Sequence, residues 1–258
     1  MVAKLISFNF KLDKEEGHAL KTALVTGGTS GIGLATVEAL VAKGYTVYVT
    51  SVRSAQAGLE MEESSNGAIR YVQTDVTDKE HRNNLYEVIK NEVSGLDVLV
   101  NNAGYTKVIP HRDLEGASDD VWAKILDTNL MGTWWMCKEF YPLLGANGGC
   151  IINVTSIAGI RPTGSSIPYA VSKAAINHLT TLLAASFENG VRVNAVAPGL
   201  IDTPWTKDWE QIREHVGKTA PLKRSGQPKD VATVICSIID ATYMTGQVIT
   251  VDGGLTLK

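Results

Sequence analysis

Short apolar runs alternate with longer amphipathic segments along most of the chain. Stretches such as Ala23-Leu24-Val25 and Val98-Leu99-Val100 are apolar at consecutive positions, which is typical of strands covered on both faces, as in parallel sheets. Between these runs apolar residues recur at helical spacing, as at Leu85, Val88 and Ile89. The predicted strands are Thr22–Thr26, Tyr45–Thr50, Ile69–Thr74, Leu96–Asn101, Gly149–Ser156, Val191–Ala197 and Gln247–Val251.

This regular alternation predicts an α/β fold with a Rossmann-like, doubly wound parallel sheet of about seven strands and helices on both faces. No linker-like Pro/Gly/Ser stretch, repeat or low-complexity tract divides the chain, so we expect a single domain over residues 21–258. Residues 1–20 precede the first strand and are interpreted as an N-terminal extension. Residues 203–228 are long for a connection in such a sheet and are interpreted as a lid.

Composition excludes several classes of protein. The chain has 24 Lys plus Arg against 27 Asp plus Glu, a net charge of -3, so no broad basic field exists to attract nucleic acid or a membrane surface. No apolar run approaches the roughly 20 residues of a membrane span, and the start lacks a signal-peptide pattern, so we expect a soluble, cytoplasmic protein. The three cysteines form no CxxC pair and are predicted to be reduced core residues. The five histidines have no paired-ligand spacing, so no metal site is predicted.

A glycine-rich turn follows the first predicted strand directly and opens a helix. Gly27, Gly31 and Gly33 would let the backbone turn tightly and let a pyrophosphate approach the helix N-terminus. A tight turn without a ligand is the alternative interpretation. No Lys-Ser or Lys-Thr follows these glycines, which disfavours a Walker-type nucleotide hydrolase.

Tyr169 and Lys173 are four residues apart on a predicted helix, which brings both side chains to one face. A free tyrosine titrates near pH ~10, so a phenol that works near neutrality needs its anion stabilised by roughly 4 kcal/mol. A nearby ammonium can supply that stabilisation. Ser156 ends a predicted strand, and active groups in open α/β sheets gather at the carboxyl ends of strands. The alternatives are two residues that merely share a helix face, and a serine that caps a strand end.

From residue 22 onward the chain resembles the short-chain dehydrogenase/reductase family, because these residues and several other motifs have the order and spacing typical of that family. The spacing of four between Tyr169 and Lys173 separates the chain from the enoyl-reductase branch, in which the gap is longer. The stretches that carry the resemblance are Thr26–Gly33, Asp75-Val76, Asn101–Gly104, Asn129, Ser156, Tyr169–Lys173, Pro198-Gly199 with Thr203, and Val251–Gly254.

The resemblance implies catalytic roles at four positions. Tyr169 would be the general acid in ketone reduction and the base in alcohol oxidation, with Lys173 lowering its pKa and binding the nicotinamide ribose. Ser156 would donate a hydrogen bond to the substrate oxygen. Asn129 would hold a water that links Lys173 to solvent.

The resemblance also implies a dinucleotide site. Asp75 is expected at the adenine, although it could instead cap the helix that starts near Asp78. Asn101 and Asn102 could instead bridge backbone groups at the strand end, and this role is expected for Asn101. The residues implied in cofactor binding are Gly27, Ser30, Gly31, Ile32, Gly33, Ser51, Arg53, Asp75, Val76, Asn102, Gly104, Tyr169, Lys173, Pro198, Gly199, Ile201 and Thr203.

The choice of dinucleotide depends on the end of the second strand. An acidic residue there would bind the ribose 2′-hydroxyl and repel a 2′-phosphate, but this chain has Ser51. Arg53 could pair with the phosphate, although it lies one place later than the arginine of many NADP-preferring relatives. The sequence therefore favours NADP(H), with NAD(H) as the alternative.

The substrate is expected to be a small-molecule ketone or alcohol, in a pocket lined by Ser156, Tyr169, Ile157, Tyr105 and Trp205. The lid tryptophans favour an apolar or ring-shaped compound. The leading function is an NADP(H)-dependent carbonyl reductase or alcohol dehydrogenase, with 3-ketoacyl-acyl-carrier-protein reduction as a variant. A non-catalytic dinucleotide-binding regulator and a structural oligomer are the alternatives. The resemblance also implies a homotetramer, or a homodimer, with contacts at the helix of Trp134 and Trp135 and at the C-terminus.

Overall fold

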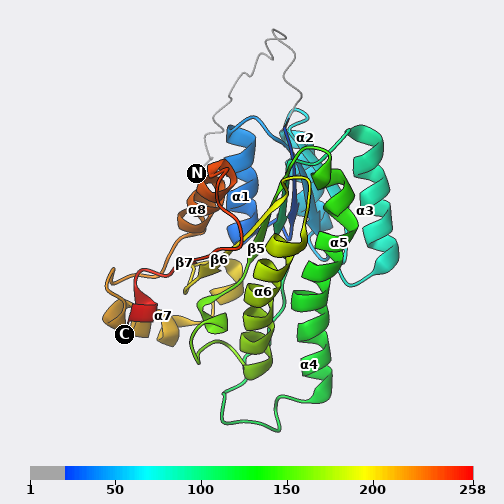
Figure 1. Ribbon diagram of the computed structural model, residues 1–258. Coiled ribbons are helices and arrows are strands. Elements are labelled where there is room, and N and C mark those ends of the chain that lie inside the picture. Colours follow the sequence, from blue (N-terminus) through cyan, green and yellow to red (C-terminus); the bar gives the residue numbers. More distant parts are fainter. Residues whose placement is uncertain (1–20, 258) are drawn as a thin grey trace.

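The computed structural model describes residues 21–257, so the predicted extension at 1–20 lies outside the described residues. Its centre is a sheet of seven parallel strands in the order β3-β2-β1-β4-β5-β6-β7 (Figure 1). The prediction of a doubly wound parallel sheet is confirmed, with strand bounds that differ from the predicted ones by a few residues. The strands are β1 (Thr22–Thr26), β2 (Thr46–Ser51), β3 (Ile69–Gln73), β4 (Val98–Asn101), β5 (Cys150–Val154), β6 (Arg192–Pro198) and β7 (Val248–Val251).

Helices cover both faces of the sheet. α1 packs against α8 on one face, and α3 packs against α5 on the other (Figure 1). The helices are α1 (Gly31–Ala42), α2 (Ala55–Ser64), α3 (Lys79–Glu92), α4 (Asp119–Ile125), α5 (Gly132–Gly145), α6 (Ile167–Ser186), α7 (Glu210–Thr219) and α8 (Pro228–Asp240). A π-helical turn, η1 (Leu126–Met131), joins α4 to α5, and 3₁₀ turns follow as η2 (Ile157–Gly159), η3 (Pro204–Thr206) and η4 (Leu255–Leu257).

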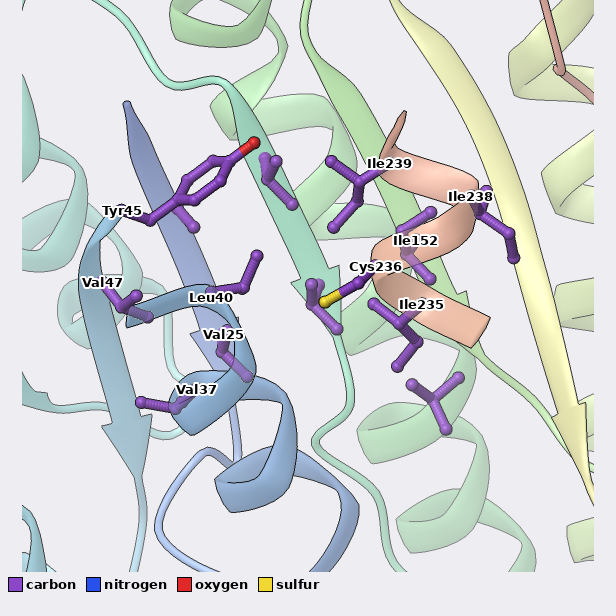
Figure 2. Close-up of a cluster of buried hydrophobic side chains, with 14 of the residues drawn as sticks. Val25, Val37, Leu40, Tyr45, Val47, Ile152, Ile235, Cys236, Ile238 and Ile239 are labelled. Carbon is purple, nitrogen blue, oxygen red and sulfur yellow. The ribbon is translucent and has the colours of Figure 1, made fainter. Parts of the chain in front are cut away.

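Two hydrophobic clusters fill the space between the sheet and its helices. Alternate residues of one strand enter different clusters because side chains of a strand point to opposite faces. Val25 belongs to the cluster under α1 and α8, and its neighbour Leu24 to the cluster under α3 and α5. Figure 2 shows Val25 and Ile152 of the sheet with Leu40 of α1 and Ile235 of α8. The consecutive apolar residues of the strands are therefore explained by burial on both faces.

The order of strands reverses between β1 and β4. β1 continues to β2 on one side, whereas β4 continues to β5 on the other. Loops that leave neighbouring strands in opposite directions leave a crevice at the carboxyl ends, where ligands of such folds bind. Cys137, Cys150 and Cys236 are buried and free, as predicted. Among the described residues, no helix combines the length and the apolar character needed to cross a membrane.

Candidate active site

A cavity of about 710 Å³ lies at the carboxyl ends of the strands. Its walls come from the turn after β1, the loops after β4, β5 and β6, the start of α6 and the segment between β6 and α7. Most of the predicted site residues line this cavity. They are Gly27, Ser30, Gly31, Ile32, Asn102, Gly104, Ser156, Ile157, Tyr169, Lys173, Pro198, Gly199, Ile201, Thr203 and Trp205.

The glycine-rich turn forms one wall through the N-terminus of α1. Gly31 has a φ of +54°, which favours glycine, and a Cβ added at Gly33 would lie 2.2 Å from the Gly27 carbonyl oxygen. The first turn of α1 contains no acidic residue, and the side chain of Ser30 caps none of its amides. Free amides at a helix N-terminus favour an anion. The turn therefore fits the pyrophosphate of a dinucleotide, although Gly33 itself lies behind the cavity wall.

Asn102 fastens this turn to β4. Its side-chain amide donates to the carbonyl oxygens of Thr26, at 3.0 Å, and Gly27, at 2.9 Å. The Thr26 hydroxyl accepts hydrogen bonds from the amides of Asn102 and Ala103 in return. Asn102 thus bridges backbone groups, the alternative given for it, whereas the same expectation for Asn101 is wrong. Asn101 points into the core, where its amide donates to the side chains of Asn153 and Cys137.

Ser156, Tyr169 and Lys173 meet at the wall of the cavity. Ser156 follows β5, and its hydroxyl accepts a hydrogen bond from the Ala158 amide, so it caps η2 as well as facing the cavity. Helix α6 begins after Ser166, which caps the Tyr169 amide, and carries Pro168 in its first turn, where proline is tolerated. The start of the helix fixes Tyr169, and one turn later Lys173 follows on the same face, with its Nζ 5.6 Å from the centre of the Tyr169 ring.

Lys173 is a buried cation without a carboxylate partner among the described residues. Its side chain is 5% exposed, and its Nζ donates to the Val154 carbonyl oxygen at 2.9 Å. An ammonium has three protons, so two remain for groups in the cavity that Lys173 lines. Burial lowers the pKa of Lys173 to about 8.

Burial raises the pKa of Tyr169 to about 12, and the Ser156 hydroxyl lowers it in part. This upward shift of the Tyr169 pKa is opposite to the downward shift that we inferred from the spacing of Tyr169 and Lys173. The reason is that the loss of hydration disfavours the phenolate. The phenol is therefore protonated at neutral pH, which is the state that a general acid needs.

Asn129 lies behind the cavity wall and is fully buried in the π-helical turn η1. Its amide donates to the Tyr105 carbonyl oxygen and the Ser172 hydroxyl, and its Oδ1 accepts from the Tyr105 amide at 2.7 Å. Both amide protons are thereby used within the fold. The described contacts make Asn129 a positioning residue for the loop after β4, and the water that we expected it to hold stays a prediction.

Four residues predicted for the adenosine end lie outside the cavity lining: Ser51, Arg53, Asp75 and Val76. Ser51 ends β2, and its hydroxyl lies 2.9 Å from the Tyr71 hydroxyl. Arg53 is exposed and forms no ion pair among the described residues. Asp75 accepts hydrogen bonds from the amide and hydroxyl of Thr77 in a local turn, and Asp78 caps α3 instead, so the alternative role of Asp75 as a helix cap is wrong. Val76 is buried under Gly132.

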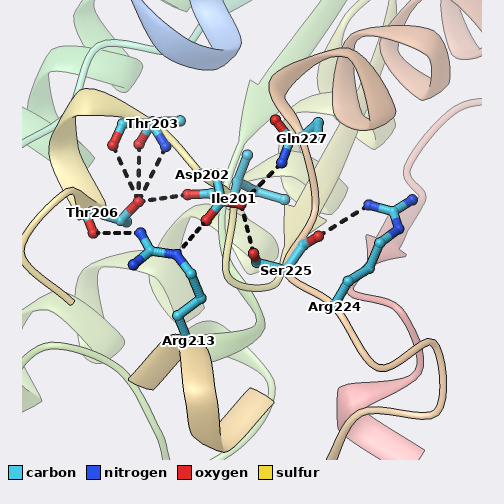
Figure 3. Close-up of polar contacts among 8 residues, drawn as sticks. All are labelled: Ile201, Asp202, Thr203, Thr206, Arg213, Arg224, Ser225 and Gln227. Atoms are coloured by element: carbon cyan, nitrogen blue, oxygen red, sulfur yellow. Dashed lines mark hydrogen bonds and ion pairs between the residues drawn. The ribbon is translucent and has the colours of Figure 1, made fainter. Parts of the chain in front are cut away.

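The segment interpreted as a lid forms the wall beside Tyr169. Trp205 contacts the Tyr169 ring edge to face, with centroids 6.5 Å apart, although 44% of Trp205 is exposed. The base of the segment is held by Asp202 (Figure 3): its carboxylate accepts from Arg213 of α7 at 2.8 Å, from Ser225 at 2.7 Å and from Gln227 at 2.9 Å. Helix α7 is thus tied to both ends of the segment that carries it.

The predicted substrate wall is only partly reproduced. Ile157 and Trp205 line the cavity, but Tyr105 does not, because its backbone is bonded to Asn129 and its ring lies under Lys124. Two further stretches, Val108–His111 and Pro162–Ser165, line the cavity as well and were not predicted. Neither stretch has apolar periodicity or a motif, so the sequence carried no signal for them.

Comparison with known proteins agrees with this geometry. A family model described as "Enoyl-(Acyl carrier protein) reductase" matches residues 27–256. "Granaticin polyketide synthase putative ketoacyl reductase 2" of Streptomyces violaceoruber is 48% identical over 239 residues, which cover 91% of this chain and 96% of that protein. The 3-oxoacyl-[acyl-carrier-protein] reductase FabG of Thermotoga maritima is 34% identical over 246 residues, covering 92% of this chain and 98% of that protein.

Solved structures show the same fold. The structure named "ElxO with NADP Bound" superposes with a TM-score of 0.85 at 31% identity, covering 93% of this chain and all of that one. The chain therefore belongs to the short-chain dehydrogenase/reductase family, and it is an NAD(P)-dependent oxidoreductase. The description of the family model mentions enoyl reduction, whereas the names of the two relatives mention ketoacyl or 3-oxoacyl reduction.

Proposed function

We propose that this chain interconverts a ketone and a secondary alcohol with NADP(H), and that Tyr169 is the general acid and base. The observation that carries the proposal is that Ser156, Tyr169 and Lys173 line one cavity together with a glycine turn that suits a pyrophosphate. When bound, the nicotinamide supplies or takes up the hydride.

The residues of the chain have separate tasks in this reaction. Ser156 donates a hydrogen bond to the carbonyl oxygen and holds it beside the Tyr169 hydroxyl. Tyr169 delivers its proton to that oxygen as negative charge develops there, and Lys173 stabilises the resulting phenolate through its positive charge. A phenol with a pKa of about 12 gives up its proton to an alkoxide, which is far more basic, but not to water. The reverse reaction uses the same groups in the opposite order.

The substrate that we favour is a bulky, largely apolar ketone, and a ketoacyl chain of the polyketide type is the second candidate. Trp205, Trp209 and Ile212 face the cavity and suit rings or long alkyl segments. The relative with 48% identity, named as a polyketide ketoacyl reductase, supports the second candidate. A net charge of -3 gives no support for a basic docking face toward an acidic carrier protein. A homotetramer or homodimer and a cytoplasmic location, the latter supported by the free cysteines, complete the proposal.

The preference for NADP(H) rests on Ser51 and Arg53. No carboxylate ends β2 to repel a 2′-phosphate, and the guanidinium of Arg53 has no ion-pair partner among the described residues that would compete for it. A hydrogen bond to a charged group contributes about 1.5–3 kcal/mol, so the Arg53→Ala variant is expected to bind NADPH at least tenfold more weakly.

Titration with NADPH and with NADH, followed by quenching of tryptophan fluorescence, tests the cofactor site without a substrate. We expect saturable binding of both, tighter for NADPH, and a ratio of affinities that falls in Arg53→Ala but not in a control, Lys90→Ala on α3. Reduction of cyclic ketones by the NADPH complex then tests turnover. Binding without any turnover would favour the non-catalytic regulator, and binding of neither cofactor would exclude the proposed function.

A further inference from the structure

Exposed apolar side chains lie where the active-site cavity opens to solvent, and no step of the proposed reaction requires them. Of the twelve large hydrophobic residues that are exposed among residues 21–257, three line this cavity: Val108, Trp205 and Ile212. Val108 is 59% and Ile212 45% exposed. Single exposed hydrophobic residues are common, but a group of them at the border of one cavity is typical of a ligand-binding groove. We call these three residues the rim.

The rim continues apolar walls that begin inside the protein. Val216 and Ile212 are four residues apart on α7, which brings both to one face of the helix, and both line the cavity. Val216 is buried and Ile212 is exposed, so this face passes from the interior to the surface. The loop after β4 repeats the arrangement, because the buried Ile109 lines the cavity next to the exposed Val108. A ligand that leaves the closed part of the cavity therefore stays in contact with apolar side chains.

Hydrogen bonds hold the two segments that carry the rim. The Ile109 amide donates to the Ser165 carbonyl oxygen at 2.8 Å, and the hydroxyls of Thr106 and Ser165 form a second hydrogen bond. These contacts lie on both sides of Val108 in the sequence and fix its loop against the start of α6. Helix α7 is held by the ion pair at the base of its segment. The exposed apolar side chains thus have a rigid support, as a binding surface requires.

The size and charge of the cavity define what reaches the rim. The cavity of about 710 Å³ is lined both by the glycine turn and by Ser156 and Tyr169, so the dinucleotide and the ketone share it. A single drug-sized ligand by itself occupies a cavity of about 300–1,000 Å³. The remaining space encloses a small ketone, and a longer one extends past the rim. Lys173 is the one Lys, Arg, Asp or Glu among the described lining residues, so the rim offers no charge to a polar tail.

We infer that Val108 and Ile212 are specificity-determining residues that bind the apolar tail of a ketone longer than the closed part of the cavity. The substrate class is an uncharged ketone with an extended alkyl or multi-ring tail, whose carbonyl lies at Ser156 and Tyr169. The inference rests on the proposed function and names its substrate class more closely. Each CH₂ group that packs on the rim strengthens binding, by up to about fourfold where it becomes fully buried.

The test measures kcat/KM of the NADPH complex for the methyl ketones from 2-butanone to 2-decanone. In the wild-type protein kcat/KM should rise by about twofold with each added CH₂ group. Val108→Ser and Ile212→Ser should each leave kcat/KM for 2-butanone within about twofold of wild type and lower it about fivefold for 2-decanone. The matched controls Leu114→Ser and Leu222→Ser change exposed leucines of the same two segments that do not line the cavity. Both controls should follow the wild type at every chain length.

Equal losses on short and long ketones would overturn the inference, as would an unchanged rise with chain length in both rim variants. A change of oligomeric state in these variants, measured by light scattering, would overturn it too, because the rim would then be a contact between copies of this chain. If the wild-type protein reduces none of the ketones, the proposed function fails for this class, and the rim is judged by calorimetric binding of 2-decanone. That binding should weaken about fivefold in the rim variants and not in the controls, and equal dissociation constants would overturn the inference.

Discussion

Two buried cations, Arg82 on α3 and Lys173 on α6, have opposite surroundings. Arg82 is 4% exposed, and its guanidinium donates to both carboxylate oxygens of Glu139, at 2.9 and 3.2 Å, and to the Val76 carbonyl oxygen. It also lies over the Trp135 ring at 4.4 Å. Lys173 is 5% exposed and has a single carbonyl partner.

The difference separates a structural charge from a functional one. A buried charge is stable when hydrogen bonds and an opposite charge replace its hydration, as they do at Arg82. At Lys173 the fold leaves the charge uncompensated, next to a cavity and a phenol. Strongly perturbed groups of this kind gather at functional sites. The comparison predicts that changes near Lys173 affect the reaction, whereas changes near Arg82 affect stability.

Tyr169→Phe should have the largest effect. It keeps both buried cations and removes only the hydroxyl that donates the proton, so kcat for ketone reduction should fall by roughly 10³-fold. Binding of NADPH, measured by fluorescence, should change less than about twofold, and the free energy of unfolding by less than about 1 kcal/mol. Turnover at the wild-type rate would remove Tyr169 from the proton transfer and would leave the charge of Lys173 without a function.

Arg82→Met should lower the free energy of unfolding by about 3 kcal/mol, because it leaves the Glu139 carboxylate and the Val76 carbonyl without their donor. Urea denaturation measures this loss. The double variant Arg82→Met/Glu139→Met should recover most of it, since no charge then remains unpaired. kcat/KM of the single variant should stay within about threefold of wild type at a temperature at which it is folded. A loss of turnover without a loss of stability would contradict a structural role.

Lys173→Met should make the protein more stable at pH 7 by roughly 2 kcal/mol, even though it loses turnover. The pKa of Lys173 is about 8 in the folded protein against 10.5 in its ordinary range, so between these values the unfolded chain binds more protons. The free energy of unfolding of the wild-type protein should therefore rise as the pH increases from about 8 to 10.5. This rise should be absent in Lys173→Met, which has no group that titrates there. Equal pH profiles for the two proteins would show that Lys173 is paired in solution.

The fold was predictable because its signals are local. Consecutive apolar residues such as Leu24 and Val25 identify strands buried on both faces, and the glycines from Gly27 to Gly33 mark the turn after the first strand. Ser156, Tyr169 and Lys173 could be found because their chemistry requires particular residue types at particular spacings. The division of the chain into an extension, one domain and a lid stays a prediction.

What the sequence did not predict depends on packing between distant segments. The direction of the Tyr169 pKa follows from burial, which a spacing of four residues does not report. The side chain of Asn129 is bonded to Tyr105, a residue that folds back onto it from 24 positions away. The cavity-lining stretch Val108–His111 was missed because it lies in an irregular loop, which the hydrogen bonds of Ile109 and Thr106 to Ser165 hold in place.

Asp202→Asn should have the smallest effect and extends the comparison to the segment beside Tyr169. Burial by itself would raise the pKa of Asp202, but the hydrogen bonds from Arg213 and Ser225 and the charge of Arg213 outweigh it, so the pKa lies below its ordinary value. The stability that the Asp202 carboxylate gives to the folded protein is therefore present at neutral pH. It is lost only as the pH falls below about 3.9 and through the pKa of the folded state.

The asparagine keeps one acceptor oxygen but presents an amide donor to Ser225 and Gln227 or to Arg213, which loosens the attachment of α7. We expect KM for the ketone to rise about fivefold, equivalent to roughly 1 kcal/mol, with kcat nearly unchanged, and amide hydrogen exchange in α7 to accelerate. The control is Asp240→Asn, which breaks the exposed ion pair of the same 2.8 Å length between the last residue of α8 and Lys43, the residue after α1. If Asp202→Asn leaves KM and hydrogen exchange in α7 unchanged, as the control should, then Asp202 does not hold the segment against the cavity. If Asp202→Asn lowers kcat instead, the carboxylate influences the reacting groups and not the attachment of α7 alone.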